Sequence, residues 1–312
     1  MKTCVVIYNP KSGHRKISYK KFQRFEEILF DYGYETKIIF TEYRGHATEI
    51  METLDHVDLV ISIGGDGTFN EVVKGNIRRD KQLLQAHLPL GTTNDIGVMF
   101  GYGENLLHNL ELAVNGVSKK IDICSINDVP FTYSACIGKY TDVPYMTPRK
   151  LKKRMGYLAY LIQIIKRLRI KKVPVYDVDF SCDGKKYSGK YTFIIVSSAD
   201  RIAGINHIYK DIKLDDDKFE ILFCALTKKI EIVRSAFYLI KGEIAKAPGF
   251  EFYRASEFKI DFHNDQHMNW CIDGDKLDFV SDKYVMDNKA KIDLLIPRKK
   301  IDELFCGKEK KQ

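Results

Sequence analysis

The sequence predicts an N-terminal α/β domain of the Rossmann-like type, followed by a C-terminal antiparallel β-sandwich domain. The first third of the chain alternates short apolar strands with helix-patterned stretches, whereas the segments after about Asp128 are short, β-rich and separated by turns. A chain of 312 residues is long enough for about two domains. We expect domains at 1–127 and 128–298, and a charged tail at 299–312 that forms a short helix and packs back on the first domain.

In the first domain, apolar runs alternate with segments of helical periodicity. Strands are predicted at Thr3–Tyr8, Thr36–Phe40, Val57–Ile63, His87–Leu90 and Ile121–Ile126. Helices are predicted between them, at about Ile17–Tyr32, Ala47–Leu54, Thr68–Ile77 and Leu106–Val114. This alternation indicates a mostly parallel sheet covered on both faces. Ligands of such sheets bind beyond the carboxyl ends of the strands.

The second domain is predicted from its short β segments. These lie at Val175–Cys182, Tyr191–Ser197, Phe219–Ala225, Phe258–Phe262, Gln266–Ile272 and Lys291–Ile296. The dipeptides Asp183-Gly184 and Asp273-Gly274 are hairpin or tight-turn signals. Together these features favour an antiparallel arrangement.

Composition and cysteine usage indicate a globular protein of the reducing cytosol. The chain is 45% hydrophobic and 29% charged. The apolar run at the N-terminus stops at Asn9-Pro10, and the run at 157–165 falls far short of the about 20 residues that a membrane span requires. None of the seven cysteines forms a C-x-x-C pair, so neither a disulfide framework nor a zinc site is indicated. We expect a cytoplasmic location.

The positive charge is concentrated in one segment. Residues 149–172 hold ten basic residues and no acidic one, and the net charge of the whole chain is +8. Apolar residues recur within this segment at helical spacing, at Leu151, Met155, Leu158, Leu161, Ile162, Ile165 and Leu168. One hypothesis is a helix that makes peripheral contact with an anionic membrane. The alternative is a helix packed on the second domain with solvated basic ends. No RNA motif or DNA-reading helix is present, so nucleic acid is not expected.

Two glycine-rich loops directly follow predicted strands. Asn9-Pro10-Lys11-Ser12-Gly13 follows the first strand, and Gly64-Gly65-Asp66-Gly67-Thr68 follows the third. Successive backbone N–H groups in such turns bind anions, and the next helix adds the positive end of its dipole. The carboxylate of Asp66 would repel phosphate unless a divalent cation lay between them. Two such loops favour nucleotide phosphate with Mg²⁺ over two unrelated tight turns. Neither G-x-x-x-x-G-K-[ST] nor G-x-G-x-x-G occurs.

A third loop follows the fourth strand, at Pro89-Leu90-Gly91-Thr92-Thr93-Asn94-Asp95. Taken alone, Asn94 and Asp95 are read as caps of the next helix. The combination N-P-K-S-G, G-G-D-G-T-F-N-E and P-L-G-T-T-N-D, in this order and spacing, resembles the catalytic domain of the diacylglycerol kinase family. The nearest resemblance is to soluble bacterial diacylglycerol kinases and YegS-like lipid kinases. Two later stretches agree, because 214–219 resembles the family's L-D-D-G and 272–275 its D-G-E.

The resemblance implies an ATP-dependent lipid kinase whose leading acceptor is the hydroxyl of diacylglycerol, with phosphatidic acid as product. It also implies Mg²⁺ and, in the second domain, a homodimer contact. The positions that would hold ATP are Asn9, Pro10, Lys11, Ser12, Gly13, Thr41, Gly64, Gly65, Asp66, Gly67, Thr68, Phe69, Asn70 and Thr92.

The same resemblance assigns a metal site and a base. Asp216, with the backbone carbonyls of Lys213 and Lys218, would bind a structural Mg²⁺. Asp66 would join the water network of that ion and face the catalytic metal. Asp275 would be the general base that takes the proton of the lipid hydroxyl. Phosphoryl transfer requires mainly in-line positioning of the reactants and neutralisation of the phosphate charge. The backbone loops, a metal ion and one carboxylate would together supply what the reaction needs.

The chain departs from the family pattern at three places. Position 275 is Asp where the family has Glu, position 217 is Asp where it has Gly, and 203–206 holds fewer glycines than usual. Three alternatives stay open. The first is an NAD kinase, which shares the G-G-D-G loop, but the G-S-T-A-Y-like element expected of such an enzyme is missing from this chain. The second is a sphingosine-type or other lipid kinase. The third is a non-catalytic nucleotide-binding protein at the membrane.

Overall fold

The computed structural model describes residues 1–13, 17–138, 175–199, 211–228, 244–263 and 269–307, with a few isolated positions between them. The chain divides into two compact units that are discontinuous in sequence. The first unit contains Met1–Ile123, Lys213–Asp216 and Ala290–Gln312, and the second contains Cys124–Ile212 and Asp217–Lys289. Two strands, β5 (Val117–Ile126) and β16 (Lys283–Ile296), contribute residues to both units.

The first unit is built on a parallel sheet. Its strands lie in the order β2, β1, β3, β4 and β16, and each neighbouring pair is parallel. The bounds are β1 Lys2–Tyr8, β2 Tyr34–Phe40, β3 Leu59–Gly64 and β4 Gln85–Pro89. All six residues of β3 are buried, as expected for the central strand of a sheet covered on both faces.

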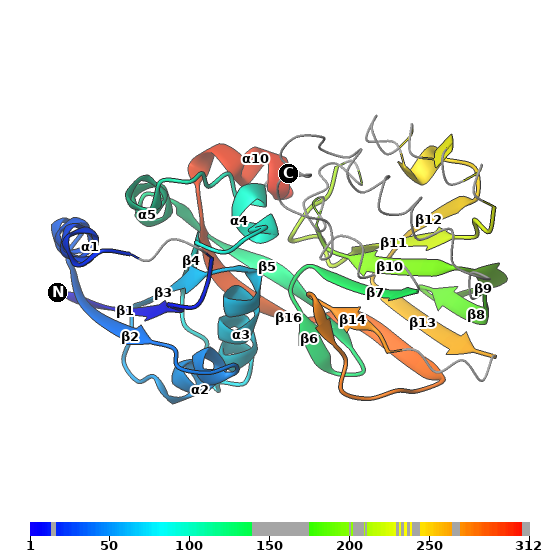
Figure 1. The fold of residues 1–312 in the computed structure, drawn as a ribbon, viewed down its shortest axis with the longest axis horizontal. Coiled ribbons are helices and arrows are strands. Elements are labelled where there is room, and N and C mark those ends of the chain that lie inside the picture. Colours follow the sequence, from blue (N-terminus) through cyan, green and yellow to red (C-terminus); the bar gives the residue numbers. More distant parts are fainter. Residues whose placement is uncertain are drawn as a thin grey trace, which may run out of the picture. The chain divides into compact units, whose positions relative to one another are not determined.

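Helices cover both faces of this sheet, with α1 and α5 on one side and α2 and α3 on the other (Figure 1). The helices are α1 Tyr19–Asp31, α2 His46–Thr53, α3 Asp66–Ile77, α4 Asp95–Met99, α5 Leu106–Val114 and, after a 3₁₀ turn at Arg298–Lys300, α10 Ile301–Leu304. Helix α1 buries Phe25, Ile28 and Leu29, the centre of its apolar face. The predicted Rossmann-like domain is confirmed.

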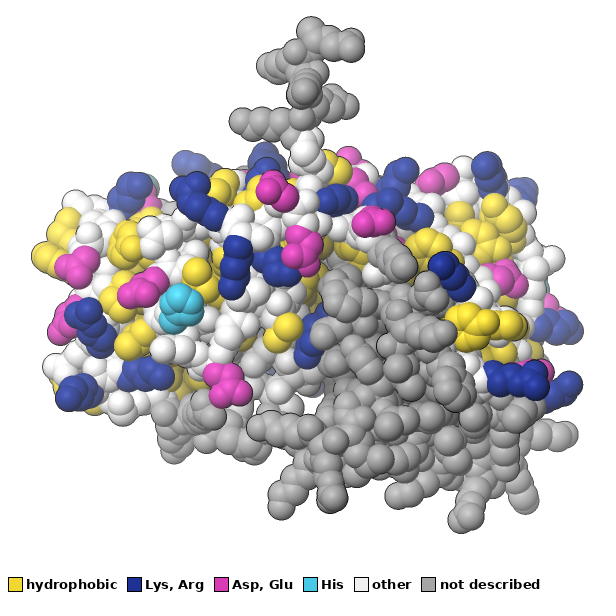
Figure 2. Space-filling model, turned by 90° about the horizontal axis from the view of Figure 1, so that it is seen from above, with side chains coloured by type: hydrophobic (Ala, Val, Ile, Leu, Met, Phe, Trp, Pro, Cys, Tyr) yellow, Lys and Arg dark blue, Asp and Glu magenta, His cyan; other side chains and the backbone are white. Residues whose placement is uncertain are grey.

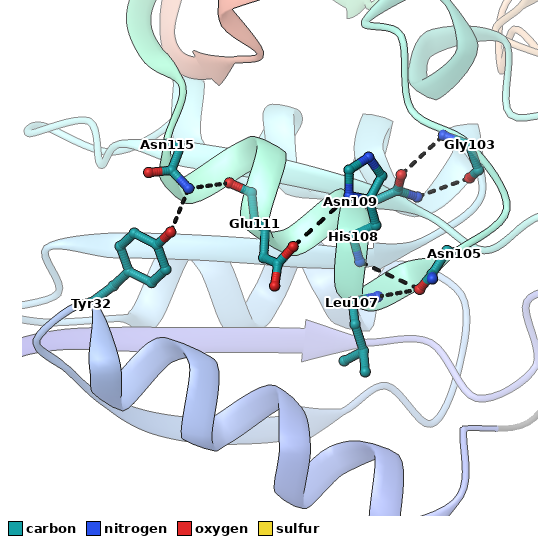
Figure 3. Close-up of polar contacts among 8 residues, drawn as sticks. All are labelled: Tyr32, Gly103, Asn105, Leu107, His108, Asn109, Glu111 and Asn115. Atoms are coloured by element: carbon teal, nitrogen blue, oxygen red, sulfur yellow. Dashed lines mark hydrogen bonds and ion pairs between the residues drawn. The ribbon is translucent and has the colours of Figure 1, made fainter.

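Helix α5 shows how polar side chains fix the ends of one element (Figure 3). The Asn105 side chain accepts hydrogen bonds from the backbone N–H groups of Leu107 and His108 and so caps the first turn. The Asn109 amide bonds both the N–H and the C=O of Gly103, each at 2.9 Å. At the other end, the Asn115 amide donates to the Tyr32 hydroxyl of the chain after α1. These bonds attach α5 to its surroundings at both ends.

The second unit is a sandwich of two antiparallel sheets. One sheet has the order β12, β11, β10, β7, β14 and β15; the other contains the part of β16 in this unit, followed by β13, β8 and β9. The bounds are β6 Val129–Phe131, β7 Ser134–Gly138, β8 Tyr176–Cys182, β9 Lys185–Tyr191, β10 Phe193–Ser197, β11 Phe219–Cys224, β12 Phe250–Ala255, β13 Glu257–Phe262, β14 Cys271–Ile272 and β15 Asp275–Lys276, with a 3₁₀ turn at Ile244–Lys246. One hydrophobic cluster that includes Phe180, Phe223 and Trp270 fills its core. The predicted β-sandwich is confirmed.

Both predicted Asp-Gly turns are present in this unit. Asp183 and Gly184 have φ values of 46° and 79° and join β8 to β9, and Asp273 and Gly274 have values of 48° and 90° and join β14 to β15. Positive φ at both central residues matches the right-handed twist of the strands. The turns therefore set the register of the two hairpins.

Candidate active site

Three loops meet beyond the carboxyl ends of β1, β3 and β4 in the first unit. The Asn9 side chain donates to the Thr68 hydroxyl at 3.0 Å, and its backbone N–H donates to the carbonyl of Ile63. The backbone N–H of Leu90 donates to the carbonyl of Gly64 at 2.6 Å. The three glycine-containing segments singled out in the sequence thus form one connected structure, because parallel strands place their following loops at the same edge.

Two glycines are required by the close approach of these loops. Gly13 has a φ of 69°, and a Cβ there would lie 2.1 Å from the carbonyl oxygen of Leu90. A Cβ on Gly91 would lie 2.4 Å from the Cα of Gly65. Any side chain at either position would push the loops apart. Backbone of this kind can approach a ligand closely.

Asp66 links two of the loops through its carboxylate. Its two oxygens accept hydrogen bonds from the backbone N–H groups of Asp95 and Ile96, at 3.0 and 3.1 Å. These groups form the start of α4, so Asp66 caps this helix, while the side chain of the N-cap residue Asn94 makes no capping hydrogen bond. Asn94 instead takes a left-handed φ of 52°. The bonds hold the Asp66 carboxylate in one orientation at the beginning of α3.

The other residues that are predicted to bind the nucleotide differ in their contacts and in their exposure to solvent. Ser12 approaches Gly65, since a Cβ on that glycine would lie 3.3 Å from the Ser12 hydroxyl. The Lys11 ammonium donates to the backbone carbonyl of Glu42 at 2.7 Å. Thr41 is buried and its N–H donates to the carbonyl of Tyr8, whereas Thr92 is exposed.

Helix α3 begins in this loop region and has twelve residues. Its first turn carries Asp66 and the exposed Gly67, while the side chains of Phe69 and Asn70 are buried. Phe69 packs against His87 and Phe100 and serves the core. A phosphate at this helix N-terminus would therefore meet the first residues of the helix, because the N–H groups of Thr68 and Phe69 both donate to the carbonyl of Gly65.

The predicted metal loop is held by backbone hydrogen bonds. The N–H of Leu214 donates to the carbonyl of Leu304, and the N–H of Asp122 donates to the carbonyl of Leu214. The Asp215 carboxylate accepts from the N–H of Cys306 at 2.8 Å, and Asp217 has a left-handed φ of 58°. The loop is thus attached to the segment around α10.

The proposed ligands in this loop are all oxygens. They are one carboxylate, on Asp216, and the backbone carbonyls of Lys213 and Lys218, the kind of donor that Mg²⁺ prefers. No group of three or more His, Cys, Asp or Glu side chains in the described ranges is arranged to hold a metal ion. That finding does not conflict with a set that contains only one side chain. The ligand assignment stays a prediction.

In the second unit, the hairpin that carries Asp275 is fixed by Asp273. This buried carboxylate accepts hydrogen bonds from the N–H groups of Thr132, Tyr133 and Ser134 at 2.6, 3.0 and 3.0 Å, and from the Thr132 hydroxyl at 2.9 Å. Burial raises the pKa of Asp273, and these hydrogen bonds oppose that shift. Asp275, two residues on, is half-buried opposite Ile272.

Two anchoring residues of the site region were not predicted. The sequence identifies Asp273 only as part of a turn, because it does not show that residues 132–134 surround this side chain. Glu71 accepts hydrogen bonds from the N–H groups of Gly45 and Ala47 at 3.0 and 3.3 Å, and so fixes the start of α2 after the loop of Thr41. Glu71 is the last residue of the motif G-G-D-G-T-F-N-E, and its place there is the sequence signal that could have identified it.

The basic segment at 149–172 and the glycine-poor stretch at 203–206 lie outside the described residues. Where side chains are described on the face seen in Figure 2, Lys and Arg are interspersed with Asp and Glu. None of the helices in the described part of the chain combines the length and apolarity that crossing a bilayer requires.

Comparison with known proteins agrees with this geometry. The family model described as diacylglycerol kinase catalytic domain matches residues 3–126. The chain is 30% identical over 272 residues to a diacylglycerol kinase of Staphylococcus aureus strain JH9, covering 86% of this chain and 85% of the relative. It is 29% identical to a diacylglycerol kinase of Bacillus subtilis strain 168, covering 97% of this chain and 99% of the relative. A crystal structure of a diacylglycerol kinase from Bacillus anthracis superposes with a TM-score of 0.73 at 20% identity, covering 96% of this chain and 99% of that one, and shares the fold.

Proposed function

This chain belongs to the diacylglycerol kinase family, and we propose that it transfers the γ-phosphate of ATP to the hydroxyl of diacylglycerol, giving phosphatidic acid. Membership of the family makes it a lipid kinase. The single observation that carries the proposal is the junction of the three loops in the first unit, where Asp66 is bonded to the start of α4. A phosphate chain with its metal ion suits such a junction.

ATP is the co-substrate in this proposal. The backbone of Asn9–Gly13 and Gly64–Asn70 binds the phosphates, and the N-terminus of α3 adds favourable electrostatics. Thr41 and Thr92 complete the nucleotide contacts. The fixed loops support this assignment, because donors that are already in place need little reorganisation when charge develops on the transferring group.

Mg²⁺ fits the residues that this chain provides. The carboxylate of Asp216 and the backbone carbonyls of Lys213 and Lys218 would hold a structural ion, and Asp66 would serve the water network of that ion and the metal at the phosphates. When bound, the ion neutralises negative charge on the phosphate oxygens. Asp66 contributes the fixed orientation that its bonds to Asp95 and Ile96 impose.

Asp275 is the general base of the proposed reaction. Its carboxylate accepts the proton of the lipid hydroxyl as the hydroxyl oxygen attacks phosphorus. The short hairpin and the four hydrogen bonds to the Asp273 carboxylate support this role, because a base has to be held in position to be effective.

We assign the chain to the cytoplasmic side of a membrane, with residues 149–172 in peripheral contact with anionic lipid, and with a homodimer as the assembled form. The charge of that segment supports the membrane contact. Flotation with neutral and anionic liposomes tests it, and equal binding to both would overturn the electrostatic part. Sedimentation equilibrium of the full chain tests the dimer.

The kinase assay uses labelled ATP, Mg²⁺ and mixed micelles of anionic lipid with diacylglycerol, monoacylglycerol, ceramide or phosphatidylglycerol in turn. Label is expected in phosphatidic acid with the wild type, and its loss is expected with Asp66→Ala and Asp275→Ala. Asp80→Ala, which removes an exposed carboxylate, is the matched control and retains activity. Label in another lipid would change the acceptor, label in NAD would revive the alternative enzyme, and ATP binding without transfer would favour a non-catalytic protein.

A further inference from the structure

Two cysteines face each other beside the hairpin of Asp275. Cys136 on β7 lies directly opposite Cys271 on β14 in an antiparallel pair. Both residues are half-buried free cysteines. Their neighbours Ala135 and Ile272 belong to the core of the sandwich, so the two thiols lie on the other face of the sheet. The residues are 135 positions apart in sequence, and their pairing arises from the fold.

The two thiols contact each other through a hydrogen bond. Because the Cys136 thiol donates to the Cys271 sulfur, the pKa of Cys271 is lowered from its ordinary value. The thiolate is the reactive form of cysteine, so Cys271 is the more reactive member of the pair.

The backbone spacing of the pair suits a strained disulfide. The N–H of Asp273 donates to the carbonyl of Ser134, which makes those opposed residues a hydrogen-bonded pair. Pair types alternate along a strand, so the cysteines two positions away also form a hydrogen-bonded pair, with Cα atoms about 5.5 Å apart. This spacing lies within the disulfide range of about 4.4–6.8 Å. The Cβ atoms of such a pair are about 5 Å apart, whereas a disulfide requires about 3.8 Å.

We propose that Cys136 and Cys271 form a reversible disulfide that lowers the kinase activity by displacing the hairpin that carries Asp275. The inference rests on the proposed function of Asp275 as the base. Closing the bond draws β14 towards β7 by about 1 Å, and a shift of that size at a reacting group costs on the order of 10²-fold in rate. Strained disulfides are readily reduced, as a switch in a reducing compartment requires.

The oxidant is a low-molecular-weight disulfide such as glutathione disulfide. The Cys271 thiolate attacks one of its sulfurs, forming a mixed disulfide and releasing one glutathione thiolate. Cys136, after losing its proton, attacks the Cys271 sulfur and releases the second glutathione. Two cysteine thiols are oxidised to one disulfide while one glutathione disulfide is reduced to two thiols. A dithiol reductant reverses both steps.

Movement of Cys271 reaches the base through the hairpin itself. On its other side Cys271 pairs with Lys276 of β15, and Ile272 pairs with Asp275. A two-residue hairpin with both ends in the ladder has little freedom to absorb a displacement. We therefore expect the strain to appear at Asp275 and to leave the nucleotide loops of the first unit unchanged.

The test treats the full-length protein, carrying Cys306→Ser to remove an exposed thiol, with glutathione disulfide under native conditions. Peptide mass spectrometry is expected to find a Cys136–Cys271 linkage. Lipid kinase activity is expected to fall about 10- to 100-fold and to return with dithiothreitol, while ATP binding is unchanged. Cys271→Ser is expected to resist inactivation, whereas Cys136→Ser is expected to stop at the mixed disulfide of Cys271 with glutathione, which peptide mass spectrometry identifies. Cys224→Ser is the matched control, because this thiol of the same sheet faces Phe193 and Phe250, and it should switch like the parent.

Each other outcome decides against part of the proposal. Failure to form the linkage overturns the disulfide site, and a linkage with unchanged activity overturns the switch. Inactivation of Cys271→Ser to the same extent as the parent would place the sensitive thiol elsewhere. Thermal melting confirms that each variant is folded. If the reduced parent phosphorylates no lipid, the proposed function fails, whereas the mapped linkage still reports on the site.

Discussion

The Asp273 carboxylate accepts hydrogen bonds from both the backbone N–H and the hydroxyl of Thr132, at 2.6 and 2.9 Å. Its second oxygen accepts from the N–H groups of Tyr133 and Ser134, each at 3.0 Å. One buried side chain therefore attaches the β14–β15 hairpin to the chain that enters β7. Asp183, in the other Asp-Gly turn, also accepts from two backbone N–H groups, those of Ser256 and Glu257, but at an exposed position.

This contrast predicts different costs for the same substitution. In Asp273→Asn, an amide NH₂ replaces an acceptor and faces buried N–H donors, so the free energy of unfolding should fall by about 1–3 kcal/mol. Asp183→Asn should cost less than about 1 kcal/mol, because water can replace the lost acceptor. Urea unfolding of both variants measures the difference. Equal losses would show that Asp273 is not the anchor of its hairpin.

Local patterns predicted the first unit well and the second less completely. The strand and helix positions in the first domain follow from apolar runs and helical periodicity, and the bounds of α5 were predicted to the residue. Strands β9 and β12 were missed because polar residues such as Lys185, Lys186, Glu251 and Arg254 interrupt their apolar patterns. Helix α4 has five residues, too few for periodicity to reveal.

The site shows the same limit in another form. The three loops could be read from their residues, because glycine and Asp66 are unusual immediately after buried strands. The pairing of Cys136 with Cys271 and the bonds from residues 132–134 to Asp273 join segments more than 130 residues apart. Such contacts depend on strand order, which no local pattern encodes.

The base assignment predicts a sharp difference between two substitutions of Asp275. Asp275→Asn keeps the size of the side chain and removes its basicity, so kcat should fall by about 10²–10⁴-fold with little change in the KM for ATP. Asp275→Glu restores the longer carboxylate that the family usually has and should keep at least a tenth of the wild-type kcat. Steady-state kinetics with diacylglycerol micelles separates the two. If both variants were equally active, Asp275 would not be the base.

The loop junction predicts that Gly13 tolerates no side chain. Gly13→Ala combines a left-handed φ of 69° with a Cβ 2.1 Å from the Leu90 oxygen, so the loops must separate. We expect the free energy of unfolding to fall by about 2 kcal/mol or more. Gly67→Ala is the matched comparison, since a Cβ there meets no atom within 4 Å and α3 favours alanine. Thermal melting of the two variants should therefore shift in opposite directions.

Burial of His87 predicts a dependence of stability on pH. Desolvation lowers the pKa of His87 to about 3, against about 6.5 in an unfolded chain. Between these values the unfolded state binds a proton that the folded state does not, so stability is full above about pH 6.5 and is lost as the pH falls towards 3. The contribution of His87 at pH 5 should be about 2 kcal/mol lower than at pH 8.

His87→Asn should remove this part of the pH dependence. Ser62→Ala is the control, because it removes the hydroxyl 2.9 Å from His87 Nδ1 and leaves the imidazole buried. Urea unfolding between pH 5 and pH 8 should show the wild-type dependence in Ser62→Ala and a weaker one in His87→Asn. The same slope in all three proteins would contradict the assignment.

At Asp217 in the metal loop, two substitutions should separate the effect of the backbone conformation from the effect of the additional carboxylate. This residue has a φ of 58°, which glycine adopts freely and which costs alanine about 1 kcal/mol. Asp217→Gly and Asp217→Ala both remove the carboxylate, so the difference between them measures the backbone, and the alanine variant should be about 1 kcal/mol less stable. If the carboxylate does not contribute to metal binding, Asp217→Gly should keep the wild-type Mg²⁺ concentration for half-maximal activity. A several-fold rise in that concentration with Asp217→Gly, without loss of stability, would instead make Asp217 an additional contributor to the metal site.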